Sequence, residues 1–204
     1  MNSIDTKERI LVVAASLFAK KGYAAIGIRE IAKEANVNIS MISYYFQGKE
    51  GVLKEIVSRF QSIYTSIYKE SYNKNRTFDE NLKELVTNLV GAFRTHTDIM
   101  KIGYLELPLE LHEIAEIKTA TIKSIIANDT IFKQLGLNEE ESPLLFSILG
   151  PVFISVMFSN FLLRPLIKEI MEFDFSDTYY EKYIEIITSF LKGGIQSTIK
   201  DFGK

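Results

Sequence analysis

Few residues in this chain could perform catalytic or metal chemistry. Its 204 residues contain no cysteine and two histidines, His96 and His112, so disulfides and thiolate metal sites are excluded and a multi-histidine metal site is not expected. His112 has Glu110 and Glu113 nearby and His96 has Asp98, but neither spacing forms a recognised catalytic arrangement. The sequence also lacks a phosphate-binding loop, a nucleophile elbow and a metal motif. We therefore expect no enzyme, no metal and no cofactor.

Charge is unevenly distributed along the chain. The 24 Lys and Arg residues and 26 Asp and Glu residues give a net charge of −2. Residues 1–50 carry seven basic and five acidic residues, a balance of +2, and residues 51–204 carry seventeen and twenty-one, a balance of −4. A slightly basic head on an acidic body suits a protein that contacts phosphates with one end. The polar first residues lack the apolar core of a signal peptide, so we expect a cytoplasmic protein.

The hydrophobic residues recur with helical spacing almost throughout, and no segment alternates as a strand would. The sequence therefore predicts an all-α fold of about nine helices. Their expected ranges are about 6–20, 28–35, 39–45, 49–72, 78–95, 99–111, 114–134, 143–163 and 177–192.

Capping and turn residues set several of these boundaries. The starts are indicated by side chains that can cap backbone N–H groups, namely Asp5 with Glu8, Asn38, Thr77 with Glu80, and Ser176. The stops are indicated by Gly22, by Pro165 and by the pair Gly193-Gly194. Asn36 can adopt the left-handed conformation of a tight turn. A kink is expected near Pro108, and a break near residues 96–98.

The three short helices at the start of the chain, with a turn at residues 36–38, predict a helix-turn-helix. The run IREIAKEANVNISMISYYFQGKEGVL, residues 28–53, follows a helix of the form ILVVAASLFAKKGY, residues 10–23. Together they resemble the TetR/AcrR (tetracycline-repressor) family of transcriptional regulators. The resemblance is carried by Ile31-Ala32, Val37, Tyr44-Tyr45-Phe46 and Lys49-Glu50. It implies a DNA-binding domain over residues 1–50 and a helical effector-binding and dimerisation domain over residues 51–204.

The resemblance also implies roles for individual residues of the head. The third helix would lie in the major groove of a double-stranded DNA operator. Its apolar side chains Ile42 and Phe46 would pack on the second helix and the turn. The residues expected to contact DNA are Ile39, Ser40, Ser43 and Tyr44, with Tyr45 at the edge, and Arg29 and Lys49 as phosphate contacts. Many relatives carry an aromatic residue at the position of Ser43, which leaves the operator preference open.

The uncharged run at residues 142–163 is long enough to cross a membrane. A membrane helix is not expected, because the acidic residues 139–141 would then lie on the cytoplasmic side and Arg164 and Lys168 outside, against the positive-inside rule. We expect instead a helix buried on all sides, with one face on its own domain and the other on a partner subunit. Small residues recur on it at Ser147, Pro151, Ser155 and Ser159. The last helix offers an apolar face of Tyr183, Ile186, Ile187 and Phe190. In relatives these two helices form the homodimer interface.

The middle helices are expected, from the same resemblance, to hold a small, largely apolar effector. Aromatic and methionine side chains could line its cavity, or equally fill an ordinary core; they are Phe93, Met100, Tyr104, Phe146, Phe153 and Met157. Candidate polar anchors are His96, Glu106, Glu110 and His112. The expected function is a repressor that binds a palindromic operator as a homodimer and is released by its ligand. The alternatives are a helical dimeric interaction module with degenerate DNA binding, and a regulator without a small-molecule effector.

Overall fold

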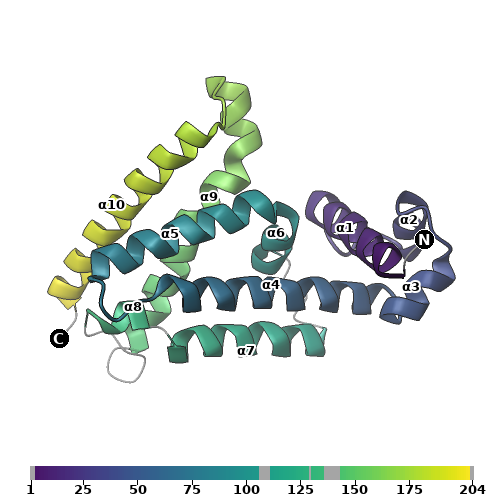
Figure 1. Cartoon of the computed structure of the whole chain (residues 1–204), viewed down its shortest axis with the longest axis horizontal. Helices are drawn as coiled ribbons and strands as arrows, with labels where there is room; N and C mark the ends of the chain where they lie inside the picture. Colours follow the sequence, from purple (N-terminus) through teal and green to yellow (C-terminus); the bar gives the residue numbers. More distant parts are fainter. Residues whose placement is uncertain (1–2, 106–110, 129, 136–142, 203–204) are drawn as a thin grey trace. The chain divides into compact units, whose positions relative to one another are not determined.

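The computed structural model describes residues 3–105, 111–128, 130–135 and 143–202, and these ranges contain helices and no strand (Figure 1). The predicted all-α class is confirmed. The helix expected over residues 114–134 is represented by α7 and the single turn α8. The helices are α1 Ser3–Lys21, α2 Ile28–Glu34, α3 Ile39–Phe46, α4 Lys49–Ser71, α5 Phe78–Thr95, α6 Thr97–Leu105, α7 His112–Asn128, α8 Thr130–Lys133, α9 Pro143–Met171 and α10 Asp177–Phe202.

Several predicted helix boundaries are confirmed by the backbone. Asn38 caps α3, since its side-chain oxygen accepts a hydrogen bond from the Ser40 N–H at 2.9 Å. Thr77 and Glu80 form the expected capping box, in which the Thr77 N–H donates to the Glu80 carboxylate at 2.8 Å. Asn36 has a φ of 50° and Gly22 a φ of 82°. The expected break between the fifth and sixth helices falls at His96.

Three predicted boundaries are wrong. α1 begins at Ser3, before Asp5, and Glu8 binds Arg59 instead of completing a cap. α9 continues through Pro165 to Met171; Pro165 is exposed there, so water can satisfy the carbonyl group that a proline leaves unbonded one turn earlier. α10 continues through Gly193-Gly194 to Phe202, because buried Leu191 and Ile195 extend its apolar stripe across the glycines. The kink expected near Pro108 lies outside the described residues.

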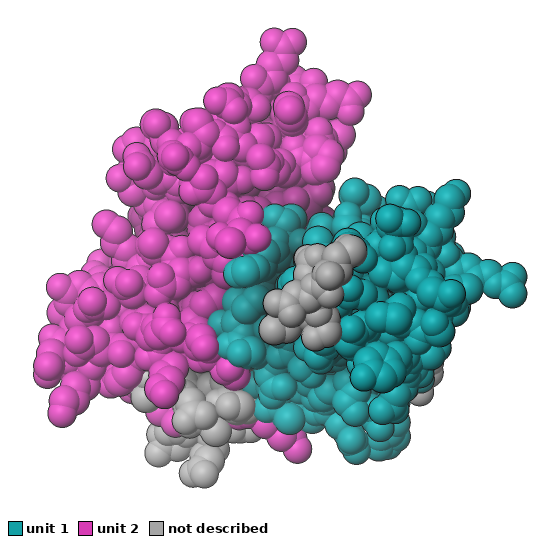
Figure 2. All heavy atoms as spheres, turned by 45° about the vertical axis from the view of Figure 1, so that its right-hand side comes forward, with its two compact units in different colours: residues 1–64, 96–122 teal, residues 65–95, 123–204 magenta. Residues whose placement is uncertain are grey.

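Contacts group the chain into two compact units, coloured separately in Figure 2. Unit 1 comprises Met1–Tyr64 and His96–Ile122, and unit 2 comprises Thr65–Thr95 and Lys123–Lys204. Unit 1 therefore contains the three helices of the head together with α6 and most of α7. The functional boundary expected after residue 50 stays a prediction.

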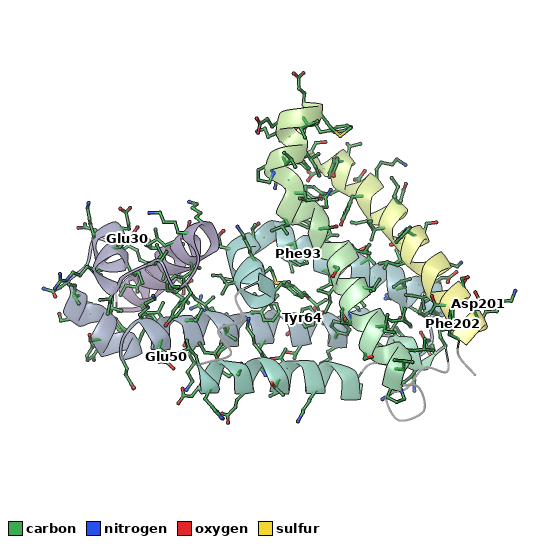
Figure 3. The ribbon with its side chains drawn as sticks, turned by 180° about the vertical axis from the view of Figure 1, so that it is seen from behind. Glu30, Glu50, Tyr64, Phe93, Asp201 and Phe202 are labelled. Atoms are coloured by element: carbon green, nitrogen blue, oxygen red, sulfur yellow. The ribbon has the colours of Figure 1, made fainter. Side chains whose placement is uncertain are left out.

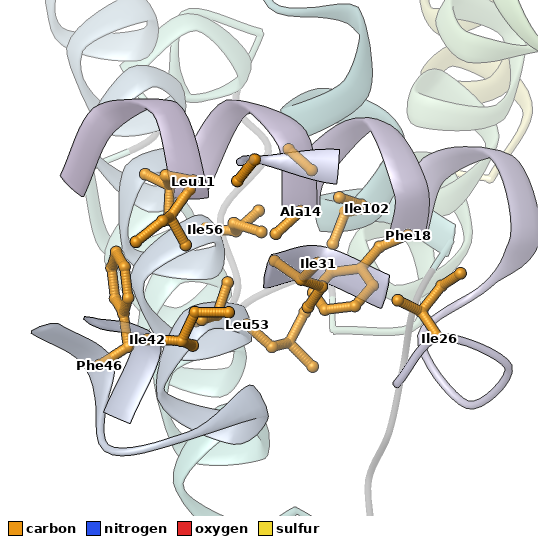
Figure 4. Packing of buried hydrophobic residues seen from close by; sticks show 14 of the residues in the cluster. Leu11, Ala14, Phe18, Ile26, Ile31, Ile42, Phe46, Leu53, Ile56 and Ile102 are labelled. Carbon is orange, nitrogen blue, oxygen red and sulfur yellow. The ribbon is translucent and has the colours of Figure 1, made fainter. Parts of the chain in front are cut away.

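The core of unit 1 is built around α1 (Figure 4). Ile10, Ala14 and Phe18 of α1 are buried, as the predicted apolar stripe requires, and they join a cluster with α2, α3 and α4. Ile102 of α6 and Ile114 of α7 belong to the same cluster. The core of the head is thus closed by two residues that lie far beyond it in the sequence.

In unit 2, α10 runs antiparallel to both α5 and α9. Arg94 at the end of α5 pairs with Asp177 at the start of α10, and Asp79 at the start of α5 pairs with Lys192. Against α9, the Tyr183 hydroxyl donates to the Met157 carbonyl group at 3.0 Å. Rings of Phe93, Phe158, Phe161 and Tyr180 stack or tilt on one another between these helices.

Candidate nucleic-acid interface

The third helix is fixed at both ends and along one face. The Asn38 cap begins it, and Gln47 ends it in a left-handed conformation with a φ of 61°. Its two buried side chains are Ile42 and Phe46. They join Ile31 and Ala32 of α2 in the core cluster, with Val37 packed against it. This confirms the predicted core face, and it leaves the opposite face of α3 turned to solvent.

Most of the predicted DNA contacts on α3 lie on that open face. Tyr44 is 78% exposed and Ile39 is 40% exposed, and Ser43 is also exposed. Together with Val12 of α1, Tyr44 and Ile39 are the exposed large apolar or aromatic residues among the described residues of the head. A row of exposed side chains on a rigid, capped helix is the arrangement that can enter a major groove.

Ser40 and Tyr45 are placed differently from these three residues. The Ser40 hydroxyl is exposed but donates to the Asn38 side chain at 3.0 Å, so it takes part in the cap. Tyr45 is half-buried and packs against the core cluster, and its ring meets the Tyr44 ring edge to face at 5.0 Å. Contact with DNA stays a prediction for all five of these α3 residues.

The basic residues of unit 1 differ in whether a carboxylate holds them. Four of them are held in ion pairs: Lys7 with Glu55, Lys21 with Glu30, Lys54 with Glu113, and Arg59 with Glu8. Within the described part of the chain, Arg29 and Lys33 of α2 and Lys49 of α4 have no carboxylate at ion-pair distance, as is also true of Arg9, Lys20 and Lys101. Glu30 on α2 and Glu50 on α4 mark this end of unit 1 in Figure 3. Cations without carboxylates therefore flank the exposed face of α3 in the sequence, on α2 and α4.

Three residues that bear on this surface were not identified from the sequence. A Cβ at Gly51 would lie 1.6 Å from the Phe46 carbonyl oxygen, so α3 and α4 approach too closely there for a side chain. Tyr23 places its ring under the Lys49 ammonium group, 4.1 Å away. Lys33, like Arg29, has no carboxylate at ion-pair distance within the described part of the chain. A glycine in the first turn of a long helix was a visible signal, whereas the position of Tyr23 depends on tertiary packing.

The residues expected to line an effector cavity are divided between the two units. Met100 and Tyr104 lie in unit 1, where the Tyr104 ring contacts Phe60 at 5.2 Å. Phe93, Phe153 and Met157 lie in unit 2 and are buried, and Phe93 is labelled in Figure 3. The Phe146 side chain, Glu106 and Glu110 lie outside the described residues. His96 and His112 are exposed, so neither lies in an enclosed cavity where it could anchor an effector.

The apolar helix α9 keeps one face open within the single chain. It is long and apolar enough to cross a membrane, and only 18% of its most apolar window is buried, so the chain by itself does not bury this helix on all sides as expected. Its exposed large residues include Leu144, Ile148, Val152 and Leu166, and those of α10 include Ile186 and Phe190. Phe158 and Tyr183, by contrast, are buried within unit 2. The small residues Ser147, Pro151, Ser155 and Ser159 are all on the exposed side.

Comparison with known protein families identifies the helix-turn-helix of the head. The family model described as bacterial regulatory proteins, tetR family, matches residues 10–56, which contain α2, α3 and most of α1. Residues 10–56 are therefore a helix-turn-helix region of the TetR family. The chain is accordingly a helix-turn-helix transcriptional regulator and not an enzyme.

Individual proteins resemble the chain over nearly its whole length. A Bacillus subtilis (strain 168) protein named "Probable HTH-type transcriptional regulator YttP" is 28% identical over 197 residues, which cover 93% of each chain. A TetR/AcrR-type regulator structure from Aquifex aeolicus VF5 is 24% identical with a TM-score of 0.57, covering 94% of this chain and 98% of that one. The fatty acid degradation regulator FadR from Bacillus halodurans is 20% identical with a TM-score of 0.67, covering 93% and 95%. The two structures extend the TetR fold beyond the head.

Proposed function

We propose that the chain is a cytoplasmic repressor that binds a palindromic DNA operator as a homodimer and is released by a small, largely apolar ligand. TetR-family regulators bind DNA. The observation that carries the proposal is the open face of α3, on which Ile39, Ser43 and Tyr44 are exposed, between cations on α2 and α4 that no described carboxylate neutralises.

The division of basic residues supports a DNA role for this surface. A paired lysine must give up its carboxylate before it can bind a phosphate, whereas Arg29 and Lys49 have no such partner to lose. The N–H groups of the first turn of α4 add donors suited to a phosphate beside Lys49. Such contacts fix the register of the protein on DNA, and exposed residues of α3 would read the base edges.

A homodimer is supported by the uncovered apolar side chains of α9 and α10. Water-exposed Leu, Ile and Phe residues in rows on two adjacent helices are costly in a free monomer and are expected to be covered. A second copy of the chain offers the same two helices, so a two-fold axis would bury all four faces together. Two heads on one two-fold axis would then require an operator of two inverted half-sites.

An apolar effector is supported by the side chains of the body. Phe93 and Met157 are each 1% exposed and Phe153 is 3% exposed. Methionine and aromatic side chains form a wall that adapts to ligand shape. The release mechanism requires that the ligand prefer a conformation that fits the operator poorly. By reciprocity, it must bind the DNA complex less tightly than the free protein.

Selection of bound duplexes from a random pool tests the DNA part of the proposal. The expected product is an inverted repeat whose half-sites are separated by about one helical turn or a multiple of it. Failure to enrich any sequence would contradict operator binding and favour a helical interaction module. Calorimetry of a releasing ligand, with and without the selected operator, tests the coupling, which equal affinities would refute.

A further inference from the structure

Lys49 occupies a position that a helix ordinarily disfavours for a cation. It is the first residue of α4, a helix of 23 residues, and the N-terminus of a helix carries partial positive charge. The structure places no carboxylate at ion-pair distance from Lys49 among the described residues. Partial burial also lowers the pKa of its ammonium group. No described carboxylate therefore neutralises this cation.

The ring of Tyr23 contacts the Lys49 ammonium group. The Lys49 Nζ atom lies 4.1 Å from the centroid of the ring, a distance at which the ring face attracts an ammonium ion. Tyr23 is itself held in place, because its ring meets the buried Phe18 ring edge to face at 5.2 Å. The turn before it is fixed by Gly22, whose N–H donates to the Phe18 carbonyl group at 2.8 Å.

An aromatic ring and a carboxylate differ in whether they leave the charge and N–H donors of a bound lysine available. Lys21 and Lys54 are held by glutamates, which neutralise their charge and occupy their N–H donors. A ring face orients the ammonium group while leaving its charge and its outward N–H groups open to an anion. Lys49 is thus restrained in position without being neutralised.

We propose that Tyr23 is a positioning residue, which holds the Lys49 ammonium group at the start of α4 ready for a DNA phosphate. This inference rests on the proposed DNA-binding function. A restrained lysine loses less side-chain freedom when it binds a phosphate than an unrestrained one. Tyr23 would therefore raise DNA affinity although its own side chain need not touch DNA.

The test compares four variants of the full-length protein. Tyr23→Leu keeps an apolar side chain against Phe18 and removes the ring face, and the matched control Tyr23→Phe keeps the face. Lys49→Gln removes the cation, and Tyr23→Leu with Lys49→Gln completes a double-mutant cycle. The probe is double-stranded DNA of random sequence, because phosphate contacts do not depend on sequence, and affinity is measured over a range of salt concentrations.

We expect Tyr23→Phe to bind as the wild type does and Tyr23→Leu to bind about threefold to tenfold more weakly. Lys49→Gln should lower the salt slope by about 0.9 for each phosphate that the lysine neutralises in the wild type. Tyr23→Leu should lower the slope in the same direction, which a packing defect alone would not do. In the Lys49→Gln background, Tyr23→Leu should have no further effect.

The outcomes separate this inference from the function on which it rests. A wild-type protein that binds no DNA contradicts the proposed function. DNA binding that survives Lys49→Gln with an unchanged salt slope overturns the inference alone. An equal loss of affinity from Tyr23→Leu with and without Lys49 also overturns it, because the ring would then act only through packing.

A measurement without DNA keeps the test decisive if Tyr23→Leu fails to fold. The ring should shift the NMR signals of the Lys49 ε-methylene group upfield in the free wild type and in Tyr23→Phe. Tyr23→Met, which also lacks a ring but keeps apolar volume, should lose the shift and bind DNA as weakly as expected for Tyr23→Leu. An unshifted Lys49 signal in the wild type would overturn the inference.

Discussion

The carbonyl oxygen of Phe46 stands 1.6 Å from the point where any side chain at Gly51 would place its Cβ atom. Phe46 is the last residue of α3, and Gly51 lies in the first turn of α4. The two helices are therefore in backbone contact. This contact fixes the orientation of the exposed face of α3, and it is possible only because Gly51 has no side chain.

Replacement of Gly51 by alanine should displace α3 from α4. A backbone carbonyl cannot rotate away as a flexible side chain can, so we expect a loss of about 1–3 kcal/mol in the free energy of unfolding and a larger proportional loss of DNA affinity. The control is Gly91→Ala in α5, where a Cβ meets nothing within 4 Å; it should raise stability by roughly 0.5–1 kcal/mol. Denaturant unfolding and mobility shifts measure both, and a Gly51→Ala protein with wild-type affinity would refute this role for Gly51.

Substitutions of Tyr44 and Ile42, both on α3, should affect DNA affinity and folding stability separately. Tyr44 is 78% exposed and Ile42 is fully buried. Tyr44→Ala should weaken DNA binding at unchanged melting temperature, whereas Ile42→Ala should cost about 2–5 kcal/mol of stability. Val12→Ala, at an exposed apolar position of α1, should change neither quantity. Thermal unfolding and DNA titration test this, and undiminished affinity in Tyr44→Ala would remove Tyr44 from the interface.

Charges placed on α10 and α9 should distinguish a dimer face from the core of unit 2. Phe190 is 64% exposed, so Phe190→Glu should give folded monomers. Phe158 is 7% exposed with its ring 5.1 Å from Phe93, so Phe158→Glu should unfold the unit instead. Val12→Glu should remain dimeric, since it adds the same charge to α1 of unit 1 and leaves the apolar faces of α9 and α10 unchanged. Equilibrium sedimentation and circular dichroism measure these results, and a monomeric wild type at micromolar concentration would contradict the dimer.

The bidentate pair between Glu8 and Arg59 should make the stability of unit 1 depend on pH. The Arg59 guanidinium group donates to the Glu8 carboxylate at 2.8 and 2.6 Å and lowers the pKa of Glu8 below 4.5. A carboxyl group with a lowered pKa stabilises the fold above its unfolded-state pKa, and this contribution disappears as pH falls through the folded-state value. The Glu8 side chain is 48% exposed, so the loss should be about 0.5 kcal/mol.

Urea unfolding below and above about pH 4.5 measures this loss. Glu8→Gln should be less stable than the wild type at neutral pH and should lose less on acidification. Glu34→Gln, which removes a carboxylate that forms no ion pair within the described part of the chain, is the control and should follow the wild-type profile. Identical acid profiles for the wild type and Glu8→Gln would contradict the assignment.

Local signals predicted the elements of the head well. The Asn38 cap, the left-handed Asn36 and the buried pair Ile42 and Phe46 follow from side-chain chemistry within a few residues, and each is confirmed. Such features depend on neighbours in the sequence, so a single sequence contains them.

Features that depend on distant neighbours were missed. The glycine pair 193–194 was expected to end a helix, but burial of Leu191 and Ile195 against the rest of unit 2 outweighs a helix-propensity cost of about 1 kcal/mol per glycine. Phe158 is buried against Phe93 of α5, a contact between two helices that no local sequence pattern reveals. For the same reason Tyr23, which meets Lys49 only in the folded head, gave no signal in the sequence.

The closure of the head core by Ile102 and Ile114 matters for anyone who wishes to exchange specificities between regulators. A graft of residues 1–50 alone would leave both isoleucines behind, and the transplanted helices would meet side chains of a different size at those two places. A chimera should therefore take residues 96–122 from the same parent protein as the three helices of the head. The segments that must be transferred together to change operator preference are then not contiguous in the gene.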